Sequence, residues 1–192
     1  MGAREGQARM LSDTEHEEFM RFLRQKAHAE RNLAVYLLTA RSGLRIGSVA
    51  GLRLSDVLDS KGKLKQVVIL RKSITKGSKT ITAYFNHPEV VQALEEYLSV
   101  RPKCKSDALF ITQKRTEFSA NSLAHTVNAL YIEAGYEGAS SHSGRRFYAS
   151  HLCKKGIDVF ALSKLMGHSS LETTRMYVVH NQDELMSMVA ST

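Results

Sequence analysis

Hydrophobic and polar positions alternate with a helical period over the first part of the chain. Ser12 and Glu15 have the spacing of a capping box, which predicts a helix from there to about Ala29. The segment 31–40 is apolar on almost every side, so a second, buried helix is expected there. It should end at Gly43, because glycine readily takes the left-handed conformation that closes a helix. A third, short helix is expected directly afterwards.

The period then changes to that of strands. Segments 66–70 and 80–85 are rich in β-branched and aromatic residues, and Gly77 lies between them in a basic stretch. This pattern predicts a β-hairpin with a basic tip. Asn86 and Pro88 then predict the start of another helix, with the asparagine as its cap, which runs to about residue 100.

The remainder of the chain has a helical pattern punctuated by glycines. Helices are expected near 120–134, 142–155, 158–166, 170–179 and 182–189. No repeat, low-complexity segment or linker interrupts the pattern. We therefore expect a tail over residues 1–10 and a single domain over residues 11–192. Its fold class is mainly α with a small antiparallel β-sheet (α+β).

The net charge of the chain indicates which class of partner it could bind. Of the 192 residues 43% are hydrophobic and 24% charged, which is ordinary for a globular protein, but the net charge is +8. Such a balance favours a polyanionic partner, nucleic acid first and an anionic membrane second, although a solvated basic surface explains it equally well. No signal peptide or membrane-spanning run is found, so a cytoplasmic location without membrane association is expected. Cys104 and Cys153 lack metal-ligand spacing and are expected to be free thiols.

The segment "HSGRRFYASHL" places polar chemistry at the start of a predicted helix. His142 and Arg145 are three positions apart and therefore share a face of that helix. Ser140 and Ser141 can cap it, which puts both side chains at its positive end, where a phosphate would be stabilised. A capped surface helix with incidental charges is the alternative.

A second stretch, "LMGHSSLETTRMY", combines a turn with a helix start. Gly167 ends one helix, and 169–172 has the pattern of a capping box for the next. His168 is therefore expected in the turn between two helices, with Tyr177 two turns into the second one. Each residue alone is ordinarily surface or packing.

Two further basic residues stand at turns. Arg45, in "SGLRIGS", follows a glycine that ends a helix, and Lys76, in "TKGSK", lies at the expected hairpin tip. Taken singly, the arginine could simply cap a helix and the lysine could be solvated.

Together these pieces resemble the catalytic domain of the tyrosine site-specific recombinases, the phage integrase and Xer-type family. The resemblance covers residues 11–190, and the order of the motifs matches. His168 follows Arg145 by 23 positions and Tyr177 follows His168 by nine, as in the family. The catalytic residues that the resemblance implies are Arg45, Lys76, His142, Arg145, His168 and Tyr177.

The resemblance implies cleavage of double-stranded DNA by phosphoryl transfer to tyrosine. Two arginines suit a phosphate in which charge develops, because guanidinium groups bind its oxygens in a bidentate manner. Tyr177 would be the nucleophile, forming a 3′-phosphotyrosine link and leaving a 5′-hydroxyl. Lys76 would protonate the leaving oxygen, and the two histidines would orient the phosphate and help to move protons. No metal ion, ATP or other cofactor is implied.

The chain departs from the family in three places. Ser48 stands where an acidic residue usually supports the first arginine, and Arg146 stands where histidine usually follows the second. We interpret Arg146 as an additional phosphate contact. Few residues precede the first helix, so an N-terminal core-binding domain is not expected within this chain, which is either a catalytic fragment or a short recombinase.

Three alternatives remain. A type IB topoisomerase uses a similar set of side chains but does not exchange partners, and a catalytically silent DNA-binding protein could share the fold. A purely structural helical domain would leave the ordered motifs unexplained. The apolar stripe of the predicted last helix favours a recombinase, because it suits docking on a neighbouring subunit, although it could instead cover the core of its own domain. The resemblance implies a homotetramer on DNA, formed by exchange of this C-terminal helix.

Overall fold

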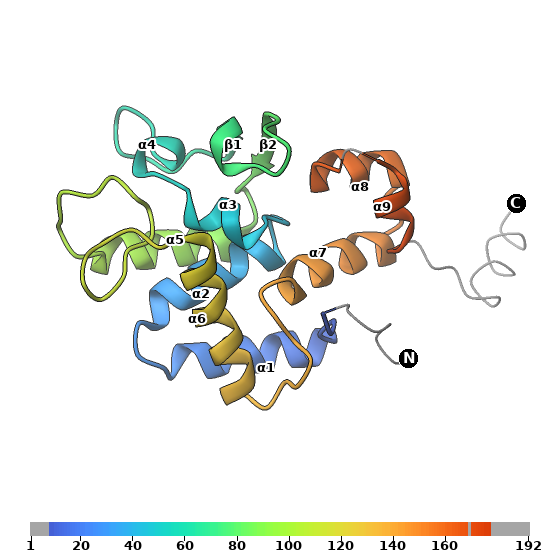
Figure 1. Cartoon of the computed structure of the whole chain (residues 1–192), viewed down its shortest axis with the longest axis horizontal. Helices are drawn as coiled ribbons and strands as arrows, with labels where there is room; N and C mark the ends of the chain where they lie inside the picture. The colour runs from blue at the N-terminus through green and yellow to red at the C-terminus, as the bar shows by residue number, and fades with distance from the viewer. Residues whose placement is uncertain (1–7, 169, 178–192) are drawn as a thin grey trace, which may run out of the picture. The chain divides into compact units, whose positions relative to one another are not determined.

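The structure is a computed structural model that describes residues 8–168 and 170–177. The chain divides into two compact units, and the boundary follows Tyr148 within helix α7, Ser143–Lys154 (Figure 1). We call the part up to Tyr148 the first unit and the part from Ala149 the second unit. The expectation of a single domain over residues 11–192 stays a prediction.

Helix α2 is the centre of the first unit. It packs against α1, α3 and α5, while α3 packs against α6. All ten residues from 31 to 40 are buried, which confirms the buried helix predicted from its uniformly apolar pattern. The helices of this unit that precede α7 are α1 (Asp13–Arg24), α2 (Ala29–Ala40), α3 (Ile46–Ala50), α4 (Leu54–Val57), α5 (Pro88–Val100) and α6 (Ala120–Glu133).

Side-chain capping explains where α1 and α5 begin. The predicted capping box is present: the Glu15 backbone N–H donates to Ser12 Oγ at 3.2 Å, and the Ser12 N–H donates to the Glu15 carboxylate at 2.8 Å. Helix α1 ends at Arg24, earlier than predicted, and α2 begins after His28, which takes a left-handed φ of 61°. The cap of α5 is His87 and not Asn86, because Pro88 fixes the first helical position directly after it.

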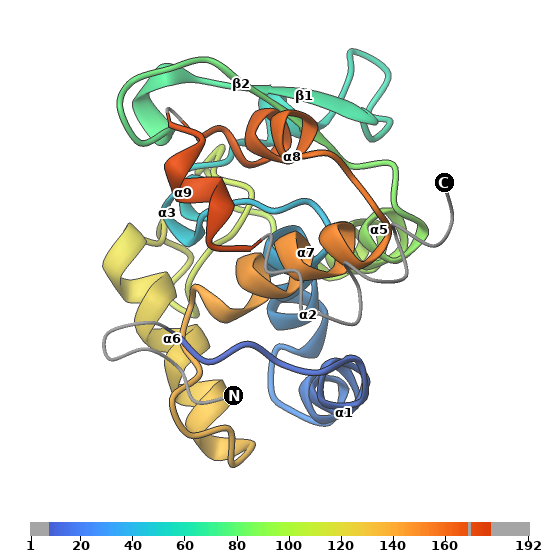
Figure 2. The ribbon, with the colours of Figure 1, turned by 90° about the vertical axis from the view of Figure 1, so that its right-hand side faces the viewer.

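The predicted hairpin is confirmed as a two-stranded antiparallel sheet of β1 (Val67–Leu70) and β2 (Ile81–Tyr84). Figure 2 shows the two strands side by side. Alternate side chains of β1 are buried, as expected for a sheet with one face on the core. The connection contains a short 3₁₀ helix, η1 (Lys72–Ile74), and Gly77, whose φ of +78° suits a tight turn.

The second unit contains the rest of α7, then α8 (Val159–Met166) and α9 (Glu172–Arg175), which contact each other. Gly167 ends α8 with a φ of +58°, as the pattern predicted. The predicted capping box for the next helix is wrong in its register: the cap position is Leu171, so Glu172 is the first helical residue and not the third. The Ser170 hydroxyl accepts the Glu172 N–H at 3.2 Å, which favours this start.

Helix α9 is short, so Tyr177 follows its end and does not lie two turns inside it. The helix predicted near 182–189 falls outside the described residues, as does most of the tail over residues 1–10. Within the ranges that the structure describes, no helix is both long and apolar enough to cross a membrane. The two cysteines, Cys104 and Cys153, are free thiols, as predicted.

Candidate active site

The turn between α2 and α3 positions the first arginine. Gly43 has a φ of +66°, which reverses the chain directly after α2, and the Leu44 N–H donates to the Leu38 carbonyl at 3.1 Å. Arg45 then occupies the N-cap position of α3 with extended backbone angles and a half-buried side chain. The short third helix that was expected after the second one is therefore confirmed, and it begins at Ile46.

Two glycines allow the start of α7 to lie directly on this turn. A Cβ atom on Gly144 would lie 2.1 Å from Thr39 Oγ1 in α2, and one on Gly43 would lie 2.5 Å from the Tyr148 ring. Such distances are too short for any larger residue unless the neighbouring side chains or the backbone move. The sequence places glycine on both sides of the contact, so α7 approaches the end of α2 closely.

Arg145 is buried at this contact. Its side chain is only 7% exposed, and Nη1 donates to the Gly43 carbonyl. Because Gly43 lies two positions before Arg45, this bond ties the second arginine to the turn that carries the first. Burial raises the pKa of the neighbouring Tyr148 phenol, and the positive charge of Arg145 partly opposes that rise.

Lys76 lies at the tip of the hairpin and is exposed. The Thr75 hydroxyl donates to the carbonyls of Lys79, at 2.5 Å, and Lys72, at 3.1 Å, which closes the turn around the lysine. The residue that replaces the family's acidic group, Ser48, donates its hydroxyl to the Ile74 carbonyl at 2.7 Å. The turn that carries Lys76 is thus attached to α3.

The pKa of the His142 imidazole is affected by three cationic residues. The residue is exposed, but partial burial of the imidazole lowers its pKa by desolvation. The positive charges of Arg145, Arg45 and Lys76 lower that pKa further, in this order of effect. The structure therefore brings these four predicted residues near one another, and we call them the cationic cluster. The lowered pKa of His142 favours the neutral form of its imidazole.

The second unit carries the other two predicted residues as a pair. The rings of His168 and Tyr177 are stacked, with centroids 6.3 Å apart and planes 14° from parallel. His168 Nδ1 lies 2.8 Å from the hydroxyl of Thr174, a fully buried residue whose carbonyl also accepts the Tyr177 N–H at 3.0 Å. Thr174 therefore fixes both the imidazole ring and the backbone of the tyrosine. Both rings are half-buried.

Sequence patterns did not single out Thr174, Thr39 or Tyr148, because each acts through a partner that no spacing rule identifies. Arg146, interpreted as an additional phosphate contact, is half-buried in α7. Ser140 Oγ accepts the His142 N–H at 3.3 Å, which agrees with the expected role of a serine at this helix start.

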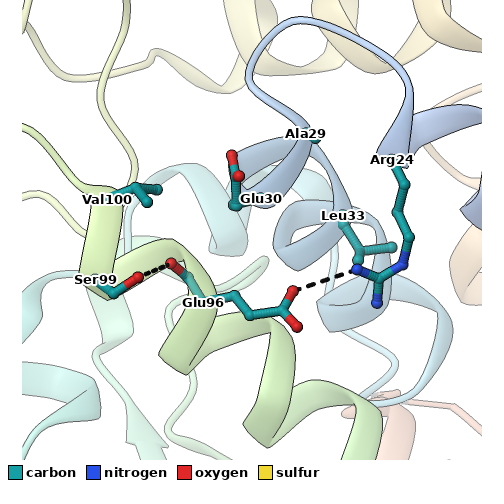
Figure 3. A pocket seen from close by; sticks show the side chains of 7 residues that line it. All are labelled: Arg24, Ala29, Glu30, Leu33, Glu96, Ser99 and Val100. Carbon is teal, nitrogen blue, oxygen red and sulfur yellow. Dashed lines mark hydrogen bonds and ion pairs between the residues drawn. The ribbon is translucent and has the colours of Figure 1, made fainter.

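One cavity of the first unit is formed by residues outside the cationic cluster. Figure 3 shows a cavity of about 340 Å³ between the end of α1, the start of α2 and the last turns of α5. An ion pair of 3.4 Å between Arg24 and Glu96 crosses it, and Leu33 contributes apolar lining. None of the six predicted residues lines this cavity, so it adds nothing to the chemistry.

Comparison with known proteins identifies relatives of the whole described fold. The model of the phage integrase family matches residues 9–184. A tyrosine recombinase XerC from Pelobacter propionicus is 30% identical over 184 residues, which is 95% of this chain and 56% of that protein. Another XerC, from Caldanaerobacter subterraneus, is 30% identical over 83% of this chain and 44% of its own length. The chain thus spans about half of the length of these relatives.

Solved structures share the fold. The crystal structure of XerA recombinase superimposes with a TM-score of 0.77 at 22% identity, covering 99% of this chain and 66% of that one. The Tn1549 transposon integrase in complex with transposon right-end DNA gives 0.80 at 19% identity, covering 100% and 68%. The expected mainly helical fold with a small antiparallel sheet is confirmed, and the chain belongs to the phage integrase family.

Proposed function

We propose that this chain is the catalytic part of a site-specific DNA recombinase. It cleaves and rejoins strands of double-stranded DNA through a covalent 3′-phosphotyrosine intermediate on Tyr177. The observation that carries the proposal is the cationic cluster, in which two arginines, a lysine and a histidine lie near one another. A phosphodiester is the polyanion that this combination suits, and membership of the phage integrase family supports the same chemistry.

Arg45 and Arg145 bind the non-bridging oxygens of the scissile phosphate. Charge on these oxygens grows as the tyrosine attacks, and guanidinium groups held in advance stabilise that charge without rearranging. The burial of Arg145 and its bond to the Gly43 carbonyl support this role, because they fix the guanidinium before the substrate arrives. Arg146 adds a further phosphate contact.

Tyr177 attacks the phosphorus. Its Oη forms a bond to phosphorus while the bond from phosphorus to the 5′-oxygen breaks, and Lys76 supplies a proton to that leaving oxygen. His168 and His142 orient the phosphate and assist in removing the phenolic proton. The stacked ring and the Thr174 contact support a fixed orientation of the His168 imidazole.

The phosphotyrosine link conserves the energy of the broken diester. The 5′-hydroxyl can therefore attack it in reverse and restore the DNA strand, so the reaction itself requires no ATP. A DNA substrate is also consistent with the expected cytoplasmic location.

Strand exchange distinguishes this proposal from a topoisomerase. Two relatives over most of the chain are named as recombinases, which favours exchange between partners. Two differently labelled duplexes that carry the recombination site should yield strands joined between them. Relaxation of supercoiled DNA without such joined products would indicate a type IB topoisomerase, and DNA binding without any adduct would indicate a silent binding protein.

We also propose that the active assembly is a homotetramer on two duplexes, linked by exchange of the C-terminal helix. The sequence supports this through the apolar stripe of Leu185, Met188 and Val189, which lie outside the described residues. Deletion of residues 182–192 should leave a folded protein that binds DNA but forms no synaptic complex in gel-shift assays. A truncated protein that still forms synaptic complexes would contradict the exchange.

A further inference from the structure

The segment that leads into the hairpin tip is attached to the α3–α4 region at several points. Arg71 Nη2 donates to the Gly51 carbonyl at 2.6 Å, and its Nε lies 3.0 Å from the Asp56 carboxylate. A Cβ atom on Gly51 would lie 2.4 Å from Ile74 Cγ2, so the isoleucine rests directly on the end of α3. These contacts fix the beginning of the connection between the strands, before Lys76.

Ser48 makes the attachment that lies nearest to Lys76 along the chain. Its side chain is 4% exposed, and its hydroxyl donates to the Ile74 carbonyl at 2.7 Å. An ionised carboxylate at this position would have no proton to donate and would repel the carbonyl oxygen. The replacement of an acidic residue by serine therefore gives this chain a donor aimed at the hairpin.

The residue that accepts this hydrogen bond, Ile74, lies only two positions before Lys76 along the chain. Ile74 precedes Thr75, whose hydroxyl closes the turn by donating to the Lys79 and Lys72 carbonyls. Lys76 follows immediately and is exposed. Its position therefore depends on how the backbone before it is held.

We propose that Ser48 is a positioning residue that holds the Lys76 turn against α3 and so directs the lysine at the leaving 5′-oxygen. The inference rests on the proposed function, since it assigns Ser48 to the proton donation by Lys76. Ser48 itself does not touch the substrate. Its removal should slow only the step that needs a proton on the leaving oxygen.

A substrate with sulfur in place of the bridging 5′-oxygen tests this directly. The Tyr177 oxygen bonds to phosphorus, the bond from phosphorus to sulfur breaks, and the thiolate leaves without needing a proton. Ser48→Ala should cleave a normal suicide substrate about five- to tenfold more slowly than wild type, the scale of one lost hydrogen bond. On the sulfur substrate its rate should return to within twofold of wild type, and Lys76→Ala should behave in the same way with a larger initial loss.

Three variants make the result specific. Ser48→Thr keeps the hydroxyl and should retain the wild-type rate. Ser55→Ala removes an exposed hydroxyl of α4 that donates to Asp107, and it should leave both substrates unaffected. The double variant of Ser48→Ala with Lys76→Ala should be no slower than Lys76→Ala alone, because both changes remove the same proton donation.

Several outcomes would overturn the inference. They are an undiminished rate for Ser48→Ala on the normal substrate, an equal loss on both substrates, or additive losses in the double variant. An equal loss would mean that Ser48 supports Arg45 or the fold. If wild type itself forms no covalent adduct on either substrate, the proposed function fails. If wild type forms the adduct and only the Ser48 pattern is absent, the inference alone fails.

Discussion

Arg145 and Lys76 belong to the same cationic cluster but are held in opposite ways. Arg145 is buried at a helix contact that excludes any Cβ atom on Gly43 or Gly144, and it is bonded to a backbone carbonyl. Lys76 is exposed at a hairpin tip, next to Gly77. A Cβ atom added to Gly77 would have no neighbouring atom within 4 Å. The difference matches the two tasks. A phosphate clamp gains from a fixed geometry, whereas a proton donor must reach an oxygen that moves as its bond breaks.

The largest expected effect comes from removing either arginine of the cationic cluster. Arg145→Ala or Arg45→Ala should lower the rate of DNA cleavage by about 10²–10³, the scale for one lost donor to a developing oxyanion. Duplex affinity should fall much less, because many basic residues share the phosphate contacts. Single-turnover cleavage and equilibrium binding measure the two quantities.

Arg21→Ala is the matched control, because it removes the same charge from an exposed position on α1. It should cleave at the wild-type rate. If Arg45→Ala cleaves as fast as this control, the phosphate clamp lies elsewhere.

Disrupting the close contact between Gly144, which precedes Arg145, and Thr39 should give the next largest effect. Gly144→Ala forces a Cβ atom against Thr39 and should destabilise the fold by about 1–3 kcal/mol, with a lower melting temperature and slower cleavage. Adding Thr39→Ala removes the 2.1 Å clash with the hydroxyl and should restore part of the loss. Thermal unfolding followed by circular dichroism measures both.

Two other glycines serve as controls for this prediction. A Cβ atom on Gly47 would lie 3.5 Å from Ala120, an ordinary contact, so Gly47→Ala should be close to neutral. Gly77→Ala meets no atom but has an unfavourable φ, so its cost should be smaller than that of Gly144→Ala. A Gly144→Ala protein as stable as Gly47→Ala would mean that α7 does not approach α2 as closely as described.

The smallest expected effect is a shift in the pKa of His142. It compares the charge of the buried Arg145 with that of the exposed Lys76. NMR titration should place the His142 pKa below its usual value of about 6.5, because burial and three neighbouring cations disfavour the protonated form. Arg145→Gln should raise that pKa more than Lys76→Met, since the charge of Arg145 has the larger effect. His142→Gln identifies the resonance. An unshifted pKa in both variants would show that the four residues are not clustered.

Local rules were sufficient for most elements of the fold. The capping box at Ser12 and Glu15 needs only residues three apart, and the all-round apolar pattern of 31–40 can be satisfied only by burial. The hairpin follows from strand formers on both sides of Gly77. Errors fell at element ends: serines near Glu172 compete as caps, and the sequence pattern did not show that α9 stops at Arg175, before Tyr177.

The site was predicted as a set of residues, but its supports were not. The six side chains were identified from the order and spacing of the motifs, which resemble those of a known family. The contacts of Gly144 with Thr39, of Ser48 with Ile74 and of Arg145 with Gly43 join residues separated by 26 to 105 positions. Such contacts depend on how helices pack in space, and no local pattern in the sequence encodes them.

The central claim is that Tyr177 becomes covalently linked to DNA. Wild type incubated with a suicide substrate should give an adduct that survives SDS, with the DNA joined through its 3′ end, and peptide mapping should place the link on Tyr177. Tyr177→Phe should bind DNA but form no adduct, while Tyr84→Phe, which changes an exposed tyrosine on β2, should form it normally. An adduct that persists in Tyr177→Phe, or that maps to another residue, would contradict the account.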